Sequence, residues 1–192
     1  MGEAMSVSGC ENDVRASNAT SETVRIPPGD LLYNDVLDFL YEEAELLDDD
    51  RLDEWLEMMD EGLSYRMPVR LTLARGDGAG FAPEATFFDD GLPMLTLRVR
   101  RLLETANAHS EMPPTRSRRF VSNVRVGVLG DDVLAQSSLL LLRSRWDSNH
   151  FEFLAARRDD VLRRSGSRLK LVRREILIEQ SVAESPNLSV FV

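Results

Sequence analysis

The first part of the chain carries apolar residues at the spacing of helix faces. Between residues 30 and 48 they recur every three or four positions with acidic residues between them, and Asp30 stands where an N-cap is expected. The pattern predicts a helix of about four turns. Its apolar face is formed by Leu32, Val36, Phe39, Leu40 and Leu47.

Two further helices are predicted from the same spacing. The second has Asp50 as its N-cap and ends at Gly62. Its apolar face carries Leu52, Trp55, Leu56 and Met59. The third follows Asp89 or Asp90 as its cap, and its apolar face carries Leu95, Val99, Leu102 and Leu103.

Strand-like alternation of apolar and polar residues begins at Tyr65 and runs to Leu73. Because Pro68 cannot donate a ladder hydrogen bond, this strand is expected at a sheet edge or with a bulge. The glycine-rich stretch from Arg75 to Ala85 lacks the lysine and hydroxyl residue of a phosphate-binding loop, so a flexible loop is expected there.

Beyond residue 114 four long strands are predicted, over residues 120–128, 133–146, 151–163 and 168–180. The short turns between them require antiparallel neighbours. In the last strand the apolar residues change phase between Leu171 and Ile176, which predicts a bulge near residues 173–175 or a sheet covered on both faces. The whole order predicts an α+β domain, with three helices on one face of a curved, mostly antiparallel sheet.

The first 25 residues differ in composition from the rest. They are poor in large apolar side chains and rich in Ser, Asn, Glu and Thr, so they cannot bury enough surface to offset their ordering entropy. We expect a flexible N-terminal tail over residues 1–25 and a single domain over residues 26–192.

The formal net charge is −10 and is unevenly distributed. Acidic residues dominate between Asp30 and Glu61, whereas arginines, several in adjacent pairs, dominate from Arg98 to Arg174. Such asymmetry occurs in nucleic-acid-binding proteins. Because the overall charge is strongly acidic, we favour arginine-rich strands that face acidic helices or another subunit, and we expect no nucleic-acid partner.

The sequence has no run of about 18 apolar residues, and its start lacks the basic and apolar regions of a secretory signal. Cys10 is the only cysteine, so an internal disulfide is excluded. A cytoplasmic location without membrane contact is expected.

Metal ligands are scarce. A Rieske cluster requires two cysteines and two histidines, and mononuclear non-haem iron requires two histidines and a carboxylate. The chain offers His109, His150 and Cys10, which excludes a Rieske site and disfavours zinc, while an iron triad would consume both histidines. The acidic run at residues 48–50 is more typical of a helix end than of a cation site. No catalytic, cofactor-binding or metal-binding residue is predicted on this chain.

Two segments have the composition of contact surfaces. The first follows Pro113-Pro114 and starts a strand rich in guanidinium groups, which suit carboxylates on another surface. The second is the apolar stretch from Asn187 to Val192, which is expected to dock in a groove. The subunit-interface residues predicted from the two segments are Arg116, Arg118, Arg119, Phe120, Leu188 and Phe191.

Several motifs, taken in order, resemble the small (beta) subunit of aromatic-ring-hydroxylating dioxygenases. They begin with Glu43-Ala44-Glu45-Leu46-Leu47-Asp48, Trp55-Leu56 and Tyr65-x-Met67-Pro68. Glu111-x-Pro113-Pro114-Thr115-Arg116-Ser117-Arg118, Phe120-Val121-Ser122-Asn123-Val124 and Arg157-Arg158-Asp159-x-Val161-Leu162-Arg163-Arg164 follow. Arg173-Arg174-Glu175-Ile176-Leu177-Ile178 and Asn187-Leu188-Ser189-Val190-Phe191 complete the set. The resemblance covers most of residues 31–192 and departs at His109, where the family often has tryptophan, and at Arg119, where it often has histidine.

The resemblance implies a nuclear-transport-factor-like (cystatin-like) cone. It implies a non-catalytic subunit, without cofactor of its own, that assembles with a large (alpha) subunit bearing a Rieske iron-sulfur cluster and a mononuclear iron. Three copies of each subunit in a hexamer, with the small subunits associating as a trimer, are implied as well. A ferredoxin and a reductase would supply electrons for cis-dihydroxylation of an arene in aromatic-compound catabolism.

Two other classes of function remain open from the residues. A free-standing cone-fold dehydratase or isomerase would need Asp35, Asp38 or Asp53 to meet His109 or His150 in a cavity. A small-molecule-binding module would use the same cavity without chemistry.

Overall fold

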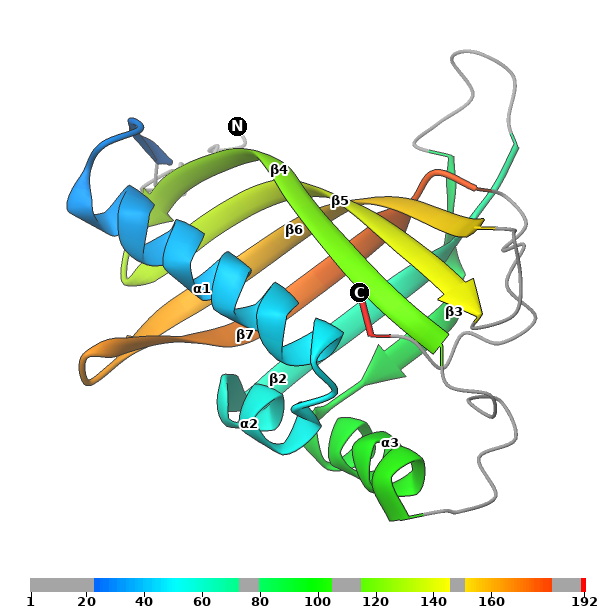
Figure 1. Cartoon of the computed structure of the whole chain (residues 1–192). Helices are drawn as coiled ribbons and strands as arrows, with labels where there is room; N and C mark the ends of the chain where they lie inside the picture. The colour runs from blue at the N-terminus through cyan, green and yellow to red at the C-terminus, as the bar shows by residue number, and fades with distance from the viewer. Residues whose placement is uncertain (1–22, 73–79, 105–114, 146–150, 181–190) are drawn as a thin grey trace, which may run out of the picture.

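The computed structural model describes residues 23–72, 80–104, 115–145, 151–180 and 191–192. Seven strands form one sheet in the order β1-β4-β5-β6-β7-β2-β3 (Figure 1). Their bounds are β1 Val24–Ile26, β2 Met59–Arg70, β3 Phe81–Asp90, β4 Thr115–Leu129, β5 Asp132–Arg145, β6 Phe151–Ser165 and β7 Arg168–Ile178. All neighbouring pairs are antiparallel except β2 and β7, which are parallel. The predicted α+β architecture is confirmed.

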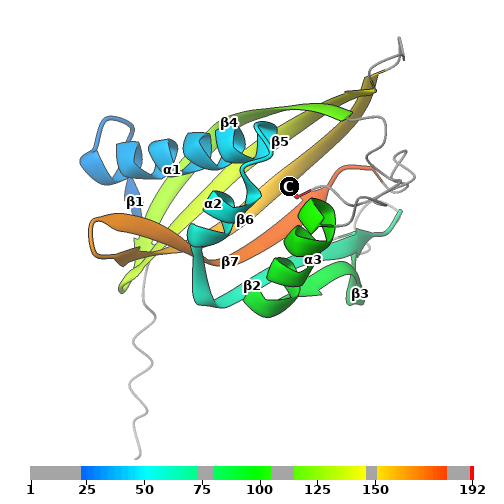
Figure 2. The same ribbon diagram turned by 60° about the horizontal axis from the view of Figure 1, so that its bottom comes forward.

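Three helices cover one face of this curved sheet (Figures 1 and 2): α1 Leu31–Asp48, α2 Leu52–Glu57 and α3 Leu92–Glu104. The Asp30 side chain accepts a hydrogen bond from the Leu32 backbone N–H at 2.8 Å, so the predicted N-cap of α1 is confirmed. The apolar stripe of α1 is buried against the sheet together with Leu95 and Val99 of α3. Among the described helices, none has the length and hydrophobicity needed to span a membrane.

Some predicted boundaries were wrong. Asp50 has a positive φ of 56° and does not cap α2, which ends at Glu57, so Met59 begins a strand. The expected glycine-rich loop gives way to β3 at Phe81, and Asp89 and Asp90 belong to that strand. The predicted tail also extended too far, because Val24 and Arg25 pair with β4. Pairing with neighbouring strands determines the bounds of these segments, and the spacing of apolar residues along the sequence does not show that pairing.

Both predicted strand irregularities are confirmed as bulges. The pairing of β2 with β3 shifts on either side of Pro68. These shifts accommodate the missing backbone N–H of Pro68, although β2 is an interior strand. In β7 the register with β6 shifts at Val172, so Leu171 and Arg174 both face the helices. An additional bulge in β4 contains Asn123, whose φ is 54°.

Alternation along the long strands separates an inner face from an outer face. Leu139 and Leu141 of β5 are buried on the inner face, whereas Leu140 between them is 41% exposed. The inner face therefore carries the core, and on the outer face of β4, β5 and β6 the large apolar side chains Phe120, Leu140 and Phe153 are exposed.

This division gives a matched pair of variants. We expect Leu141→Ala to lower the free energy of unfolding by about 2–5 kcal/mol, because it leaves a cavity on the inner face. Leu140→Ala should cost only about 0.5 kcal/mol. Urea unfolding of the two variants measures both values, and equal losses would contradict the assigned strand register.

Candidate functional site

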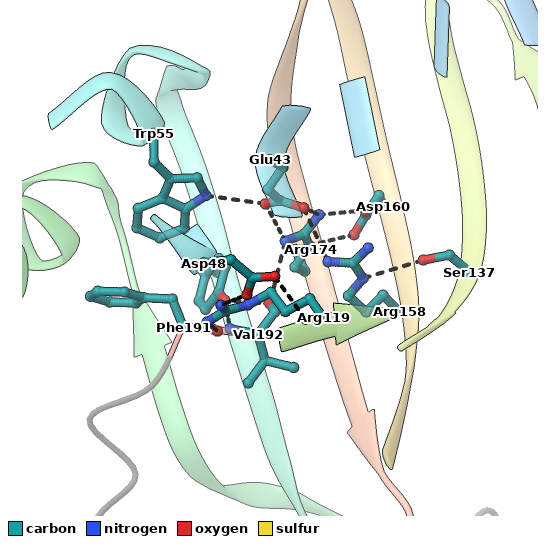
Figure 3. Close-up of polar contacts among 11 residues, drawn as sticks. Glu43, Asp48, Trp55, Arg119, Ser137, Arg158, Asp160, Arg174, Phe191 and Val192 are labelled. Atoms are coloured by element: carbon teal, nitrogen blue, oxygen red, sulfur yellow. Dashed lines mark hydrogen bonds and ion pairs between the residues drawn. The ribbon is translucent and has the colours of Figure 1, made fainter. Parts of the chain in front are cut away.

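Four charged residues form a buried ion network between α1 and the sheet (Figure 3). Glu43 projects from α1, Arg158 and Asp160 from β6, and Arg174 from β7. The Arg174 guanidinium donates from Nε and Nη2 to both oxygens of Asp160, each at 2.8 Å. It also donates from Nη1 and Nη2 to Glu43, at 2.5 and 2.8 Å. Arg158 Nη1 donates to the second Glu43 oxygen at 3.0 Å.

The register of β6 and β7 brings these charges together. Asp160 pairs with Arg174 across the strands, and Arg158 lies two residues away on the same face. The bulge at Val172 is what turns Arg174 toward the helices. The register of β6 and β7 thus positions Arg158, Asp160 and Arg174, and α1 supplies Glu43.

The electrostatic balance favours the charged state of Glu43. Burial alone would raise its pKa, but the adjacent Arg174 and Arg158 guanidinium groups more than reverse that effect and lower the pKa from 4.5 to about 2. Burial also lowers the pKa of Arg158, and Arg174 beside it acts in the same direction. The pKa of Arg174 is raised, because its two carboxylate partners outweigh the opposing effect of burial.

The network reaches outward through neutral side chains. The Trp55 indole N–H of α2 donates to Glu43 at 3.2 Å, and Arg158 Nε donates to the Ser137 hydroxyl of β5 at 3.2 Å. Arg158 Nη2 is buried without a hydrogen-bond partner among the described residues. One carboxylate of α1 therefore ties α2 and three strands together.

A second buried pair lies beside the network. Arg119 of β4 donates from Nη1 and from its backbone N–H to Asp48, at 2.7 and 2.9 Å, and both side chains are 3% exposed. Arg119 Nη2 donates to the Phe191 carbonyl oxygen at 2.8 Å. The Tyr65 hydroxyl donates to the Val192 carbonyl oxygen at 2.5 Å and accepts from the Val192 N–H at 2.9 Å.

Aromatic rings occupy the space between these polar groups. The Phe191 ring lies 4.6 Å from the Trp55 ring at an interplanar angle of 34°, and Tyr65 meets Trp55 edge to face at 6.3 Å. Trp55, Tyr65, Phe191 and Val192 are all buried. The space between α2, β2 and β4 is therefore occupied by the chain's own side chains and by Phe191 and Val192.

The structure divides the predicted interface residues by exposure. Arg116, Arg118 and Phe120 of β4 are exposed, whereas Arg119 and Phe191 make their contacts inside the chain. Phe191 and Val192 are buried against the chain's own residues, and the interface role of Phe191 stays a prediction. Leu188 lies outside the described residues.

An aromatic and aliphatic band crosses the open outer face of the sheet. Phe120 pairs with Leu140, and the next outward row is Arg118, Leu142 and Phe153. Phe120 and Phe153 are each 53% exposed. We call this surface the outer band; it consists of Arg116, Arg118, Phe120, Leu140, Leu142, Phe151 and Phe153.

A charged groove of about 450 Å³ lies on another surface, between the helices and the β6–β7 hairpin. Asp35 and Asp38 line it opposite Arg164, which pairs with Asp35 at 2.7 Å. Acidic helices thus face basic strands, as expected from the charge distribution. His109 and His150 lie outside the described residues, as does Cys10. Within the described ranges, no group of three or more His, Cys, Asp and Glu side chains is arranged to hold a metal ion.

The ion network was not predicted from the sequence, although signals for it exist. Glu43 falls within the apolar face of α1, where a carboxylate requires a buried partner. Arg174 shares the inward phase of Ile176 and Ile178 in β7. Both positions place a charged residue where the local pattern calls for an apolar one.

Comparison with known proteins identifies the family. The model of the ring hydroxylating beta subunit family matches residues 42–185. The chain belongs to this family. This beta subunit is 33% identical over 186 residues to the biphenyl 2,3-dioxygenase subunit beta of Rhodococcus jostii strain RHA1, covering 93% of this chain and 98% of that protein. It is 34% identical over 166 residues to a benzene 1,2-dioxygenase subunit beta of Pseudomonas putida, covering 83% and 88% of the two chains.

A solved structure of similar shape is naphthalene 1,2-dioxygenase with indole bound in the active site. Its matching chain has a TM-score of 0.74 at 24% identity, with 84% of this beta subunit and 86% of that chain covered. At this identity the likeness concerns the fold, and it confirms the predicted nuclear-transport-factor-like cone.

We predict that Glu43→Gln lowers the free energy of unfolding by about 3–5 kcal/mol, because it leaves Arg174 and Arg158 buried without their shared carboxylate. The exposed neighbour Glu42 provides the control, since Glu42→Gln should change stability by about 0.5 kcal/mol or less. Urea unfolding at neutral pH decides this, and similar losses in both variants would be incompatible with a shared buried network.

The lowered pKa of Glu43 predicts an acid-dependent loss of stability. Its contribution is fully present above the unfolded pKa of 4.5 and is lost as the pH falls toward the folded pKa of about 2. The stability difference between the wild type and Glu43→Gln should therefore shrink below pH 4.5, by about 3 kcal/mol in all. Unfolding curves between pH 6 and pH 3 should show about 2 kcal/mol of this loss, because pH 3 still lies above the folded pKa, and a constant difference over this range would contradict the prediction.

Proposed function

We propose that this beta subunit is a non-catalytic structural subunit of an aromatic-ring-hydroxylating dioxygenase. The observation that carries the proposal is the contrast between its two sheet faces. The inner face is occupied by the paired ion network and by Phe191 and Val192, whereas the outer face presents an open apolar band. Such a division suits a protein that contributes shape and contacts.

The packing of the described inner-face residues supports placing the chemistry on another chain. A cone-fold enzyme needs a cavity in which its acid and base meet the substrate. Here the inward ionisable groups Glu43, Asp160 and Arg174 are bonded to one another in a buried cluster. The proposed large (alpha) subunit carries the Rieske iron-sulfur cluster and the mononuclear iron, and this chain binds no cofactor.

The outer band is the proposed contact with the large subunit. Exposed aromatic side chains beside arginines are the residue types that dominate association energies at protein interfaces. Phe120 and Phe153 supply apolar area, while Arg116 and Arg118 offer guanidinium groups to carboxylates. The partner surface is therefore expected to be apolar at its centre with acidic residues at its rim.

The proposed assembly has three copies of each subunit in a cytoplasmic hexamer, in which the small subunits also associate as a trimer. A ferredoxin and a reductase supply electrons to the large subunit. The relatives are named for biphenyl and benzene dioxygenation, so the proposed substrate is an arene that is cis-dihydroxylated for catabolism.

Co-expression with a large subunit of this dioxygenase class tests the proposal. Phe153→Ser and Phe120→Ser should each weaken subunit association at least about tenfold, because a buried aromatic contact is lost. Tyr41→Ser on α1 is the matched control, since Tyr41 is also about half exposed but lies away from the outer band. Size-exclusion chromatography and sedimentation give the association constants.

Two results would count against the proposal. One is full dioxygenase activity from the large subunit alone, without co-purification of this chain. The other is an unchanged dissociation profile for both phenylalanine variants.

A further inference from the structure

Phe191 and Val192 are held in the way that a protein holds a bound peptide. They belong to no strand of the described sheet. Their backbone groups bond to side chains of Arg119, Tyr65 and Arg174, the last at 3.3 Å from the Val192 carbonyl oxygen. The backbone groups of a chain normally bond to other backbone groups in helices and strands. Here side chains bond to them instead, as side chains do to a bound peptide.

The pocket has two chemically distinct parts (Figure 3). One part is an aromatic slot, where the Phe191 ring lies against the fully buried Trp55 ring. The other is a set of donors to two main-chain oxygens: Arg119 Nη2 bonds that of Phe191, and Tyr65 Oη and Arg174 Nη1 bond that of Val192. An aromatic ring with an acceptor group would satisfy the slot and the Arg119 donor.

The guanidinium of Arg119 indicates which acceptor group fits best. Its Nη2 donates to the single Phe191 carbonyl oxygen, while its Nε is buried and has no hydrogen-bond partner among the described residues. Nε and Nη2 lie on one edge of the planar guanidinium, and this edge binds both oxygens of a carboxylate. Arg174 uses the same edge on Asp160, with both bonds at 2.8 Å. The Phe191 carbonyl oxygen bonds to one of the two donors on this edge of Arg119. A carboxylate would bond to both.

We infer that the space beneath the helices is a ligand site for a small aromatic carboxylate, which Phe191 and Val192 occupy in the unliganded chain. The ring would take the place of the Phe191 side chain on Trp55. The carboxylate would take the place of the Phe191 carbonyl at Nε and Nη2 of Arg119. Because the occupant is covalently attached, it competes at a high effective concentration, and a free ligand binds the wild type weakly.

Phenylacetate is the probe, and Phe191→Ala in the full-length chain weakens the internal competitor. Isothermal titration should show one site per chain, with phenylacetate bound at least about tenfold more tightly to Phe191→Ala than to the wild type. Phenylacetamide, which keeps the ring but offers one acceptor oxygen, should bind about tenfold more weakly than phenylacetate. The Trp55 indole N–H resonance should shift during the titration.

Arg119→Lys in the Phe191→Ala background tests the two-oxygen contact. Lysine keeps the positive charge beside Asp48 but lacks the planar edge, so the preference for phenylacetate over phenylacetamide should disappear. Tyr41→Ala removes a half-exposed ring from α1 and is the matched control, for which binding should equal that of the wild type. Phe191→Leu replaces Phe191→Ala if the alanine variant does not unfold cooperatively.

A cooperatively folded Phe191 variant that binds toluene and phenylacetate equally would overturn the inference, because it would mark an ordinary core cavity. Absence of binding, or a preference that survives Arg119→Lys, would overturn it as well. The titrations need no large subunit, so their failure leaves the proposed structural role untouched.

Discussion

The ion pair between Glu43 and Arg174 is the interaction on which the rest of the structure depends. It joins α1 to β7 at a point where both groups are fully buried, and Asp160 and Arg158 complete it from β6. Isolated buried charges are strongly unfavourable, so the helix must lie where its carboxylate meets both guanidinium groups. The position of α1 in turn places Asp48 next to Arg119, which holds the carbonyl of Phe191.

This constraint accounts for the different composition of the two faces of the sheet. The inner face combines charges that are mutually paired with a slot that the chain fills from its own sequence. The outer face carries exposed rings and arginines. A subunit that contributes contacts to a larger assembly needs a rigid inner face and an open outer face, and the strand register of β4, β5 and β6 provides both.

Much of the fold was predictable, because in long segments the period of the apolar residues shows which side chains are buried. The four long strands, the cap at Asp30 and the bulge in β7 follow from alternation and turn chemistry. The strand β3 and the end of α2 did not follow, because pairing with β2 decides them. The buried network was missed for a related reason: Glu43 and Arg174 are 131 residues apart, and only the tertiary structure shows that each provides the other's partner.

The central claim is that this chain supplies structure and no chemistry, and turnover per assembled complex tests it most directly. Tyr65 is a suitable residue, because its hydroxyl is buried on the inner side of the sheet, where burial raises its pKa. With the large subunit reconstituted and the concentration of assembled complex measured, Tyr65→Phe should leave product formed per complex within about twofold of the wild type. A loss of a hundredfold or more in fully assembled complex would place this subunit within the catalytic machinery and contradict the account.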